Sequence, residues 1–341
     1  MFGMVPLPRT LEAALRDLGD PKLQVRLSAA RDLARHVDDD RARVISGLDR
    51  ALRDDSGQVR ATAAELLGDL EAVEALPSLL VTVEDEIDLV RQHAIYALGM
   101  IGDSRAQKRL ERALEDPRPE LRFQAVMAYP RVVSEPAHAV RALVKASRDP
   151  DEHVAHMAFR MAETLAAEGE VVDPAVLRRA LEALDDERAR VRAVAAVIVA
   201  RSGRGEADEL LVQLVSGALA TPELEDVSAA IELCGDRRLE RARAALARRA
   251  FGGLLGFGRD PLRWNARTSL ARLGDERARR EILAELDARS PDVRTLAVSA
   301  AGRARMLEAY DRVLAMKDDP RRADPSTVEA ALAQLDEERA A

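Results

Sequence analysis

The stretch DDSGQVRATAAELLGDL, residues 54–70, decides the fold because its pattern returns along most of the 341-residue chain. A turn that contains an acid or proline precedes an apolar residue and usually Arg. A pair of small residues and then Leu follow within the next turn or two of a helix. The pattern returns at residues 20–34, 84–103, 115–129, 185–200, 259–275 and 290–302. Repeats of this size are typical of a solenoid, in which each unit buries its apolar face only against a neighbour.

The apolar residue before the recurrent Arg gives the repeat length. It recurs at intervals of 31 to 37 residues, at Val25, Val59, Val90, Leu121, Val154, Val191, Val227, Leu262 and Val293. Each interval holds two amphipathic stretches of about 10–15 residues at helical spacing. We therefore expect an all-α, right-handed α-solenoid of about ten helix pairs, built as a single repeat array over residues 1–341.

The two ends of the array are expected to be capping repeats with polar outer faces, at residues 7–35 and 306–336. The weakest match to the pattern lies at residues 206–234, where Arg is absent from its position. The last residues, 336–341, are expected to fray.

The composition favours helices that pack closely through small side chains, because the chain is 47% hydrophobic but only 3% aromatic. No run of eighteen apolar residues occurs, so we expect no membrane span. The N-terminal stretch lacks the features of a secretory signal. The only cysteine, Cys234, has no internal disulfide partner and is expected to be buried. Together these features predict a cytoplasmic protein.

Charge is spread unevenly along the chain, whose formal net charge is −8. Residues 1–234 carry 42 acidic and 30 basic side chains, whereas residues 235–305 carry 17 arginines and 9 acids. We call residues 235–305 the Arg-rich zone. The acidic body is expected to prefer a basic partner, and the Arg-rich zone an acidic one or a phosphate.

The pattern Asp-x-x-x-Val-Arg-x-x-Ala-Ala-x-x-Leu-Gly-x-x-Gly-Asp resembles HEAT repeats, above all the short bacterial kind first described in phycobilisome lyases. This resemblance covers nearly the whole chain. It implies that the second helix of each pair lines a concave face, and that the recurrent Asp and Arg side chains pair between neighbouring units as a structural ladder. The implied ladder arginines are Arg26, Arg60, Arg91, Arg122, Arg192, Arg263 and Arg294. Ala155 interrupts the ladder in the fifth unit.

Catalytic relatives of this fold use motifs that the chain lacks. HEAT-like deoxyhypusine hydroxylases bind two irons through His-Glu dipeptides, and no His-Glu occurs here. His153 and His156 are three apart beside Glu152 but have no clear third ligand nearby. No phosphate-binding loop of the Walker type occurs. We therefore expect no enzyme activity, no cofactor and no metal.

Second helices of the third to fifth units carry unusual side chains at positions that should face away from the core. Among them are Tyr96, Phe123, Met127, His156 and Arg160. Aromatic residues, Met and Arg are enriched in binding hot spots. These five are therefore candidate partner-binding residues, although Phe123 and its neighbours also suit packing between helices.

A second candidate is the glycine-rich apolar insertion at residues 251–260. Its apolar side chains are Phe251, Leu254, Leu255 and Phe257, and Arg259 and the only tryptophan, Trp264, lie beside them. Four glycines in seven residues oppose a helix. The insertion is either a hook for a partner or a membrane surface, or a loop packed on the flank of the array.

We expect this chain to be a protein–protein interaction scaffold or adaptor that binds a partner along its concave face. Nucleic-acid or phosphate binding through the Arg-rich zone is the alternative from another class of function. A bilin-lyase-like enzyme is a further alternative, which follows from the resemblance and has no motif of its own to test.

Overall fold

The computed structural model describes residues 9–166, 172–221, 223–252, 260–317 and 319–340. These residues form twenty α-helices and four short 3-10 helices, and no strand occurs among them. The predicted all-α solenoid class and the ten helix pairs are thus confirmed. The chain divides into two compact units, unit 1 at residues 1–176 and unit 2 at residues 177–341.

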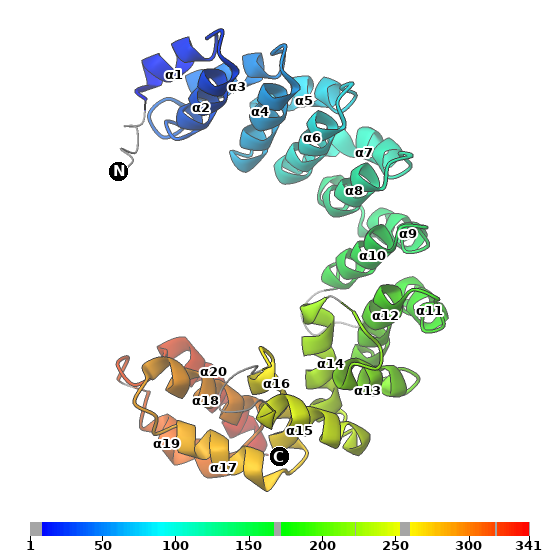
Figure 1. The fold of residues 1–341 in the computed structure, drawn as a ribbon, viewed down its shortest axis with the longest axis vertical. Helices are drawn as coiled ribbons and strands as arrows, with labels where there is room; N and C mark the ends of the chain where they lie inside the picture. The colour runs from blue at the N-terminus through cyan, green and yellow to red at the C-terminus, as the bar shows by residue number, and fades with distance from the viewer. Residues whose placement is uncertain (1–8, 167–171, 222, 253–259, 318, 341) are drawn as a thin grey trace. The chain divides into compact units, whose positions relative to one another are not determined.

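Unit 1 contains five complete helix pairs, in which the first and second helices form separate layers (Figure 1). The pairs are α1 (Leu11–Asp17) with α2 (Leu23–Ala34), α3 (Arg41–Ala51) with α4 (Gly57–Asp69), α5 (Leu76–Thr82) with α6 (Asp88–Ile101), α7 (Gln107–Ala113) with α8 (Pro119–Val132), and α9 (Pro136–Ala146) with α10 (Glu152–Thr164). The 3-10 turns η1 (Val73–Ala75) and η2 (Ser104–Ala106) lead into α5 and α7.

Unit 2 continues the paired pattern, and its boundary with unit 1 falls inside α11. The pairs are α11 (Pro174–Ala183) with α12 (Ala189–Arg201), α13 (Asp208–Ser216) with α14 (Leu224–Asp236), α15 (Arg243–Phe251) with α16 (Arg263–Arg272), α17 (Glu276–Glu285) with α18 (Pro291–Arg303), and α19 (Tyr310–Leu314) with α20 (Pro325–Ala340). The 3-10 turns η3 (Glu240–Ala242) and η4 (Leu307–Ala309) lead into α15 and α19.

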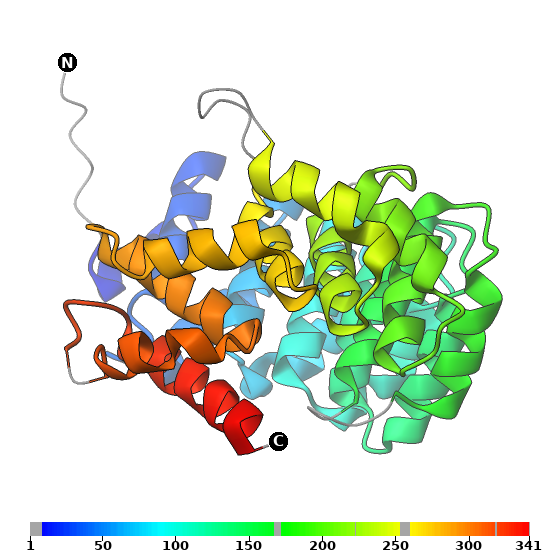
Figure 2. The same ribbon diagram turned by 90° about the horizontal axis from the view of Figure 1, so that it is seen from below.

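The C-terminal helix α20 packs beside α18, as the two views show in red and orange (Figures 1 and 2). The expectation that residues 336–341 fray is wrong as far as Ala340, where α20 ends. Two contacts hold this last turn. Arg305 pairs with Glu338 at 2.9 Å, and the guanidinium of Arg339 lies 4.4 Å from the ring centre of Tyr310.

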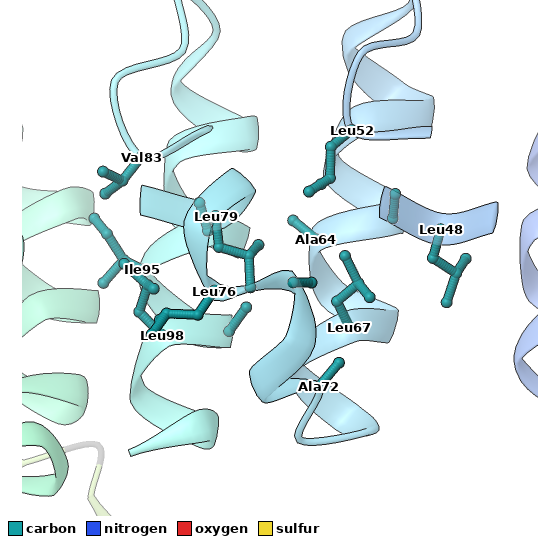
Figure 3. Packing of buried hydrophobic residues seen from close by; sticks show 14 of the residues in the cluster. Leu48, Leu52, Ala64, Leu67, Ala72, Leu76, Leu79, Val83, Ile95 and Leu98 are labelled. Atoms are coloured by element: carbon teal, nitrogen blue, oxygen red, sulfur yellow. The ribbon is translucent and has the colours of Figure 1, made fainter. Parts of the chain in front are cut away.

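The core of unit 1 runs from one repeat to the next between its two layers of helices (Figure 3). Leu48 of α3, Leu67 of α4, Leu76 and Leu79 of α5 and Leu98 of α6 are fully buried. Burial of one such side chain contributes roughly 1.5–3 kcal/mol. Since each repeat supplies only part of this core, neighbouring repeats stabilise one another.

The Leu-Gly step of the repeat allows neighbouring second helices to approach closely. A Cβ atom added at Gly68 of α4 would lie 2.8 Å from the Cα of Ala97 in α6. The same contact recurs at Gly302 of α18, where the distance to the Cα of Ala331 in α20 is 2.6 Å. Only glycine leaves room for the neighbouring backbone at these positions.

The predicted Asp–Arg ladder is confirmed at three steps of unit 1. Nε and Nη2 of Arg60 donate to the two carboxylate oxygens of Asp85 at 2.8 and 2.9 Å, and its Nη1 donates to the carbonyl of Asp54 at 2.9 Å. Each such arginine therefore ties its own turn to the turn of the next repeat. The equivalent pairs are Arg26 with Asp54 and Arg122 with Asp149.

The ladder changes at other steps because other groups compete for the carboxylate. Arg91 pairs with Asp88 in its own helix and lies 3.8 Å from Asp116. Asp116 is bound instead by Nε of Arg118 at 2.9 Å. At Arg294 the next turn offers backbone carbonyls in place of a carboxylate, among them that of Arg321 at 3.0 Å.

Candidate functional site

A groove of roughly 370 Å³ opens across the second helices α6, α8 and α10 of unit 1. Its walls come from three successive repeats, at the first half of each helix. The lining residues are Gln92, Pro119, Glu120, Phe123, Gln124, Asp151 and His153. Of the five candidates that the sequence placed on these helices, the groove therefore contains Phe123 alone.

Phe123 gives the groove its apolar floor. Phe123 packs on a buried cluster that includes Val126, Leu143 and Val154, and it is itself only partly buried. Both interpretations of Phe123 from the sequence therefore hold, because its side chain packs between helices and also lines the groove. An aromatic ring held in this way offers apolar area at little cost in conformational entropy.

The rim of the groove is polar and partly acidic. Asp151 caps α10, and its Oδ1 accepts the backbone N–H groups of His153 at 2.9 Å and Val154 at 3.2 Å. The imidazole Nδ1 of His153 lies 3.5 Å from the same oxygen. Glu120 on α8 is exposed. The rim therefore combines two carboxylates with an imidazole.

The amide side chains complete the chemistry of the groove. Gln92 and Gln124 lie on α6 and α8 and can each donate and accept hydrogen bonds. Such groups match the alternating N–H and C=O groups of an extended peptide backbone. The apolar floor at Phe123 suits an apolar side chain of such a peptide, and the acidic rim suits a basic one.

Tyr96 and Met127 lie on the same second helices but do not line the groove. The hydroxyl of Tyr96 donates to Oδ1 of Asp69 at 2.7 Å. This hydrogen bond, followed by burial, raises the pKa of Tyr96 above its ordinary value. The hydroxyl therefore links α6 to α4. Met127 is half-buried on α8.

The two candidates on α10 are held within the unit. Nη1 of Arg160 pairs with Oε2 of Glu163 at 3.0 Å, one turn further along the helix. His156 is buried, with 7% of its surface exposed. It therefore differs from His153, which is exposed at the groove. The structure thus brings Phe123 together with groove residues, and not with His156 or Arg160.

The ends of the 251–260 insertion are anchored in unit 2. The guanidinium of Arg277 lies 3.9 Å from the ring centre of Phe251, and Arg249 pairs with Asp260 at 2.7 Å. Beyond the insertion, the guanidinium of Arg267 lies 4.8 Å from the ring centre of Trp264. The remaining candidates of the insertion, Leu254, Leu255, Phe257 and Arg259, lie outside the described residues.

Besides Gln92 and Gln124, which were not partner-binding candidates either, four lining residues of the groove were missed: Pro119, Glu120, Asp151 and His153. All four lie in the turn or first turn of a second helix, whereas the sequence argument considered only positions after the aligned apolar residue. A signal was present, because the acidic or proline-containing turn recurs in every repeat. What the sequence lacks is the offset between neighbouring helices, which brings the start of α10 beside the middle of α8.

Residues 45–130 match the family model described as HEAT repeats. With the ten helix pairs and the Asp–Arg ladder, this match defines the class: the protein is an α-solenoid whose residues 45–130 match HEAT repeats. No curated protein sequence matches the chain. Among the described residues, no helix combines the length and the apolar character needed to cross a membrane.

Several solved structures are similar in fold. One is the complex of CpcE and CpcF of phycocyanin lyase from Nostoc sp. PCC7120, at 20% identity and a TM-score of 0.44, over 72% of this chain and 96% of that chain. An engineered protein is 17% identical to this chain, with a TM-score of 0.42, over 96% of this chain and 98% of that chain. YibA of Escherichia coli is 16% identical, with a TM-score of 0.41, over 96% of this chain and 93% of that chain.

Proposed function

We propose that this protein is a non-enzymatic scaffold or adaptor, and that it binds a basic peptide segment of another protein in the groove over α6, α8 and α10. The observation that carries the proposal is the partly buried side chain of Phe123, framed by glutamines and carboxylates from three successive repeats. An apolar anchor with a polar rim is the common arrangement of a binding hot spot.

The charge of unit 1 favours a basic partner. Residues 1–176 carry 31 acidic and 23 basic side chains, and Glu120 and Asp151 stand at the groove itself. Complementary charge raises the association rate and orients the partner. Because packed helices form the groove, little conformational entropy is lost there when a peptide binds.

The test is co-purification from host cells followed by mass spectrometry, with variants of the groove beside the wild type. Phe123→Ala removes the apolar floor, and the double change Glu120→Lys with Gln124→Lys reverses the charge of the rim without altering the core. The matched control is Val81→Ala on α5, where the side chain is 72% exposed and lies outside the groove.

A partner that the wild type and Val81→Ala retain and both groove variants lose would support the proposal. Retention of that partner by the charge-reversed double variant, with circular dichroism unchanged, would overturn it. A triple change of Tyr96, Met127 and Arg160 to Ala measures how far the contact extends along the three helices. We expect it to weaken binding less than Phe123→Ala does.

The nucleic-acid alternative requires exposed positive charge in the Arg-rich zone. Many of these arginines pair with carboxylates within unit 2: Arg237 with Asp208, Arg241 with Glu209, Arg249 with Asp260, Arg267 with Glu285 and Arg279 with Glu308. Paired guanidinium groups release few counterions from DNA. We therefore expect no salt-dependent mobility shift with duplex DNA, even at low ionic strength.

The enzyme alternative is tested on the same purified material. Metal analysis and an absorption spectrum above 300 nm would detect a bound metal or chromophore. We expect neither. A stoichiometric chromophore or metal would replace the scaffold proposal with a catalytic one.

A further inference from the structure

A second pocket, of roughly 540 Å³, lies wholly in unit 2, where the ends of the second helices α14, α16 and α18 meet α17 and α20. Its lining is mostly charged. The lining residues are Gly235, Asp236, Arg238, Arg272, Arg279, Ala304, Arg305 and Glu338. Four guanidinium groups therefore stand against the carboxylates of Asp236 and Glu338, and Arg279 also pairs with Glu308 just outside the lining.

Two of these arginines occupy a backbone conformation that favours glycine. Arg238 has φ 51° and Arg305 has φ 52°, and each follows the end of a second helix. The backbone N–H of Arg238 donates to the carbonyl of Gly235 at 3.1 Å, and that of Arg305 donates to the carbonyl of Gly302 at 2.9 Å. This is the hydrogen-bond pattern of a Schellman helix end.

Glycine stands at the same helix-end position elsewhere in unit 2. Gly203 and Gly274 have φ 83° and 76° there. The left-handed conformation is costly for any residue with a side chain, and such strain clusters at functional sites. Glu71 of unit 1 has the same conformation at the same helix-end position, so the strain alone marks no site; what sets Arg238 and Arg305 apart is that both line one pocket.

The positive charges in this pocket are only partly neutralised. Arg238 is exposed and forms no ion pair with any described residue, whereas its neighbour Arg237 pairs with Asp208. Arg272 is tied to Asp236 and donates to the carbonyl of Arg303 at 2.6 Å. Burial, and then the nearby charge of Arg303, hold the pKa of Arg272 below its ordinary value. A bound anion would relieve this repulsion.

We propose that this pocket binds a phosphate group carried on a small organic molecule. Planar guanidinium groups bind phosphate oxygens through paired, charge-assisted hydrogen bonds. The volume lies within the range of about 300–1,000 Å³ that is typical of small-molecule sites, which leaves room for an organic group beyond the phosphate.

The test is calorimetric titration of the full chain with phenyl phosphate, inorganic phosphate and succinate at one low ionic strength held with NaCl. We expect phenyl phosphate to bind more tightly than inorganic phosphate, and succinate to bind weakly or not at all. Tighter binding of inorganic phosphate than of phenyl phosphate would show that the pocket does not prefer a phosphate on an organic group. Binding of succinate as tight as that of phenyl phosphate would show that the pocket is not specific for phosphate.

The decisive variant is Arg238→Gly, because it removes a guanidinium and relieves the strained backbone at once. Its fold is therefore expected to be at least as stable as that of the wild type, while phenyl phosphate binds roughly tenfold more weakly, as for one lost charge-assisted hydrogen bond. The matched control is Glu71→Gly in unit 1, where φ is 46° at the same helix-end position.

Glu71→Gly is expected to relieve the same strain and leave phenyl phosphate binding unchanged. Unchanged binding in both Arg238→Gly and Arg305→Gly would overturn the proposal. Since this pocket lies in unit 2 and the peptide groove in unit 1, loss of partner capture in groove variants and loss of phosphate binding here are independent outcomes.

Discussion

Gly99 of α6 faces Ala128 of α8 so closely that a Cβ atom at Gly99 would lie 2.8 Å from the Cα of Ala128. A methyl group there must push the two helices apart, because the neighbour is backbone and cannot rotate away. The glycine of the Leu-Gly step therefore sets the distance between neighbouring repeats.

Gly99→Ala is expected to lower the free energy of unfolding by about 1–3 kcal/mol, the usual cost of overpacking. Urea denaturation followed by circular dichroism measures the change. Gly19→Ala is the matched control, since the nearest atom to a Cβ at Gly19 is 3.7 Å away and its φ is not positive. Equal stability of the two variants would show that the close helix contact is not a constraint.

Arg60→Ala is expected to lower the free energy of unfolding by about 2–3 kcal/mol. Arg60 and Asp85 are only 11% and 12% exposed at their side chains, so the variant leaves a largely buried carboxylate and a backbone carbonyl without their donor. Thermal denaturation checks the size of the effect. Lys145→Ala, which removes an exposed pair with Glu115, is expected to change stability by less than about 0.5 kcal/mol.

His36 makes the N-terminal repeat sensitive to pH. Its Nδ1 lies 2.6 Å from Oδ2 of Asp39 and its Nε2 lies 2.8 Å from the carbonyl oxygen of Arg9. Only the doubly protonated imidazolium can donate to both acceptors. The hydrogen bond with Asp39, and then that with Arg9, raise the pKa of His36 above 6.5.

The folded state therefore binds the His36 proton more tightly than the unfolded state does. The resulting stabilisation is complete below pH 6.5 and is lost as the pH rises through the raised pKa. Titration of the imidazole by NMR gives the pKa directly. The stability difference between wild type and His36→Gln should shrink as the pH rises, and a difference independent of pH would contradict this account.

Cys234 is expected to be inert towards thiol reagents in the native protein. It is fully buried at the end of α14, and burial, followed by the charge of Asp208, raises its pKa to about 12. Reagents attack the thiolate. At pH 8 labelling should be at least about 1,000-fold slower than in denaturant, because it requires the chain to open. Rapid labelling of the native protein would place the thiol at an accessible site.

The repeat pattern alone was enough to predict the helices and how they pair. Most repeats carry their own apolar spacing, turn acid and arginine, so the same local argument applies again and again along the chain. The ladder at Arg60 and Arg122 followed from the implied Asp–Arg pairing. The frayed tail was predicted wrongly, because Glu338 is held by a residue 33 positions earlier, Arg305, and local sequence carries no sign of that contact.

The sequence by itself thus determined the class of fold, because the helices and their pairing follow from a pattern that each repeat carries. It was wrong about His156, which was expected to face away from the core and is buried. Only the tertiary structure decided which side chains meet. Gln92, Phe123 and His153 lie about one repeat apart, yet they share a groove. Arg238 and Arg305 come together in the same way. Such sites depend on the offset and angle between stacked helices, which side-chain packing sets and a single repeat does not encode.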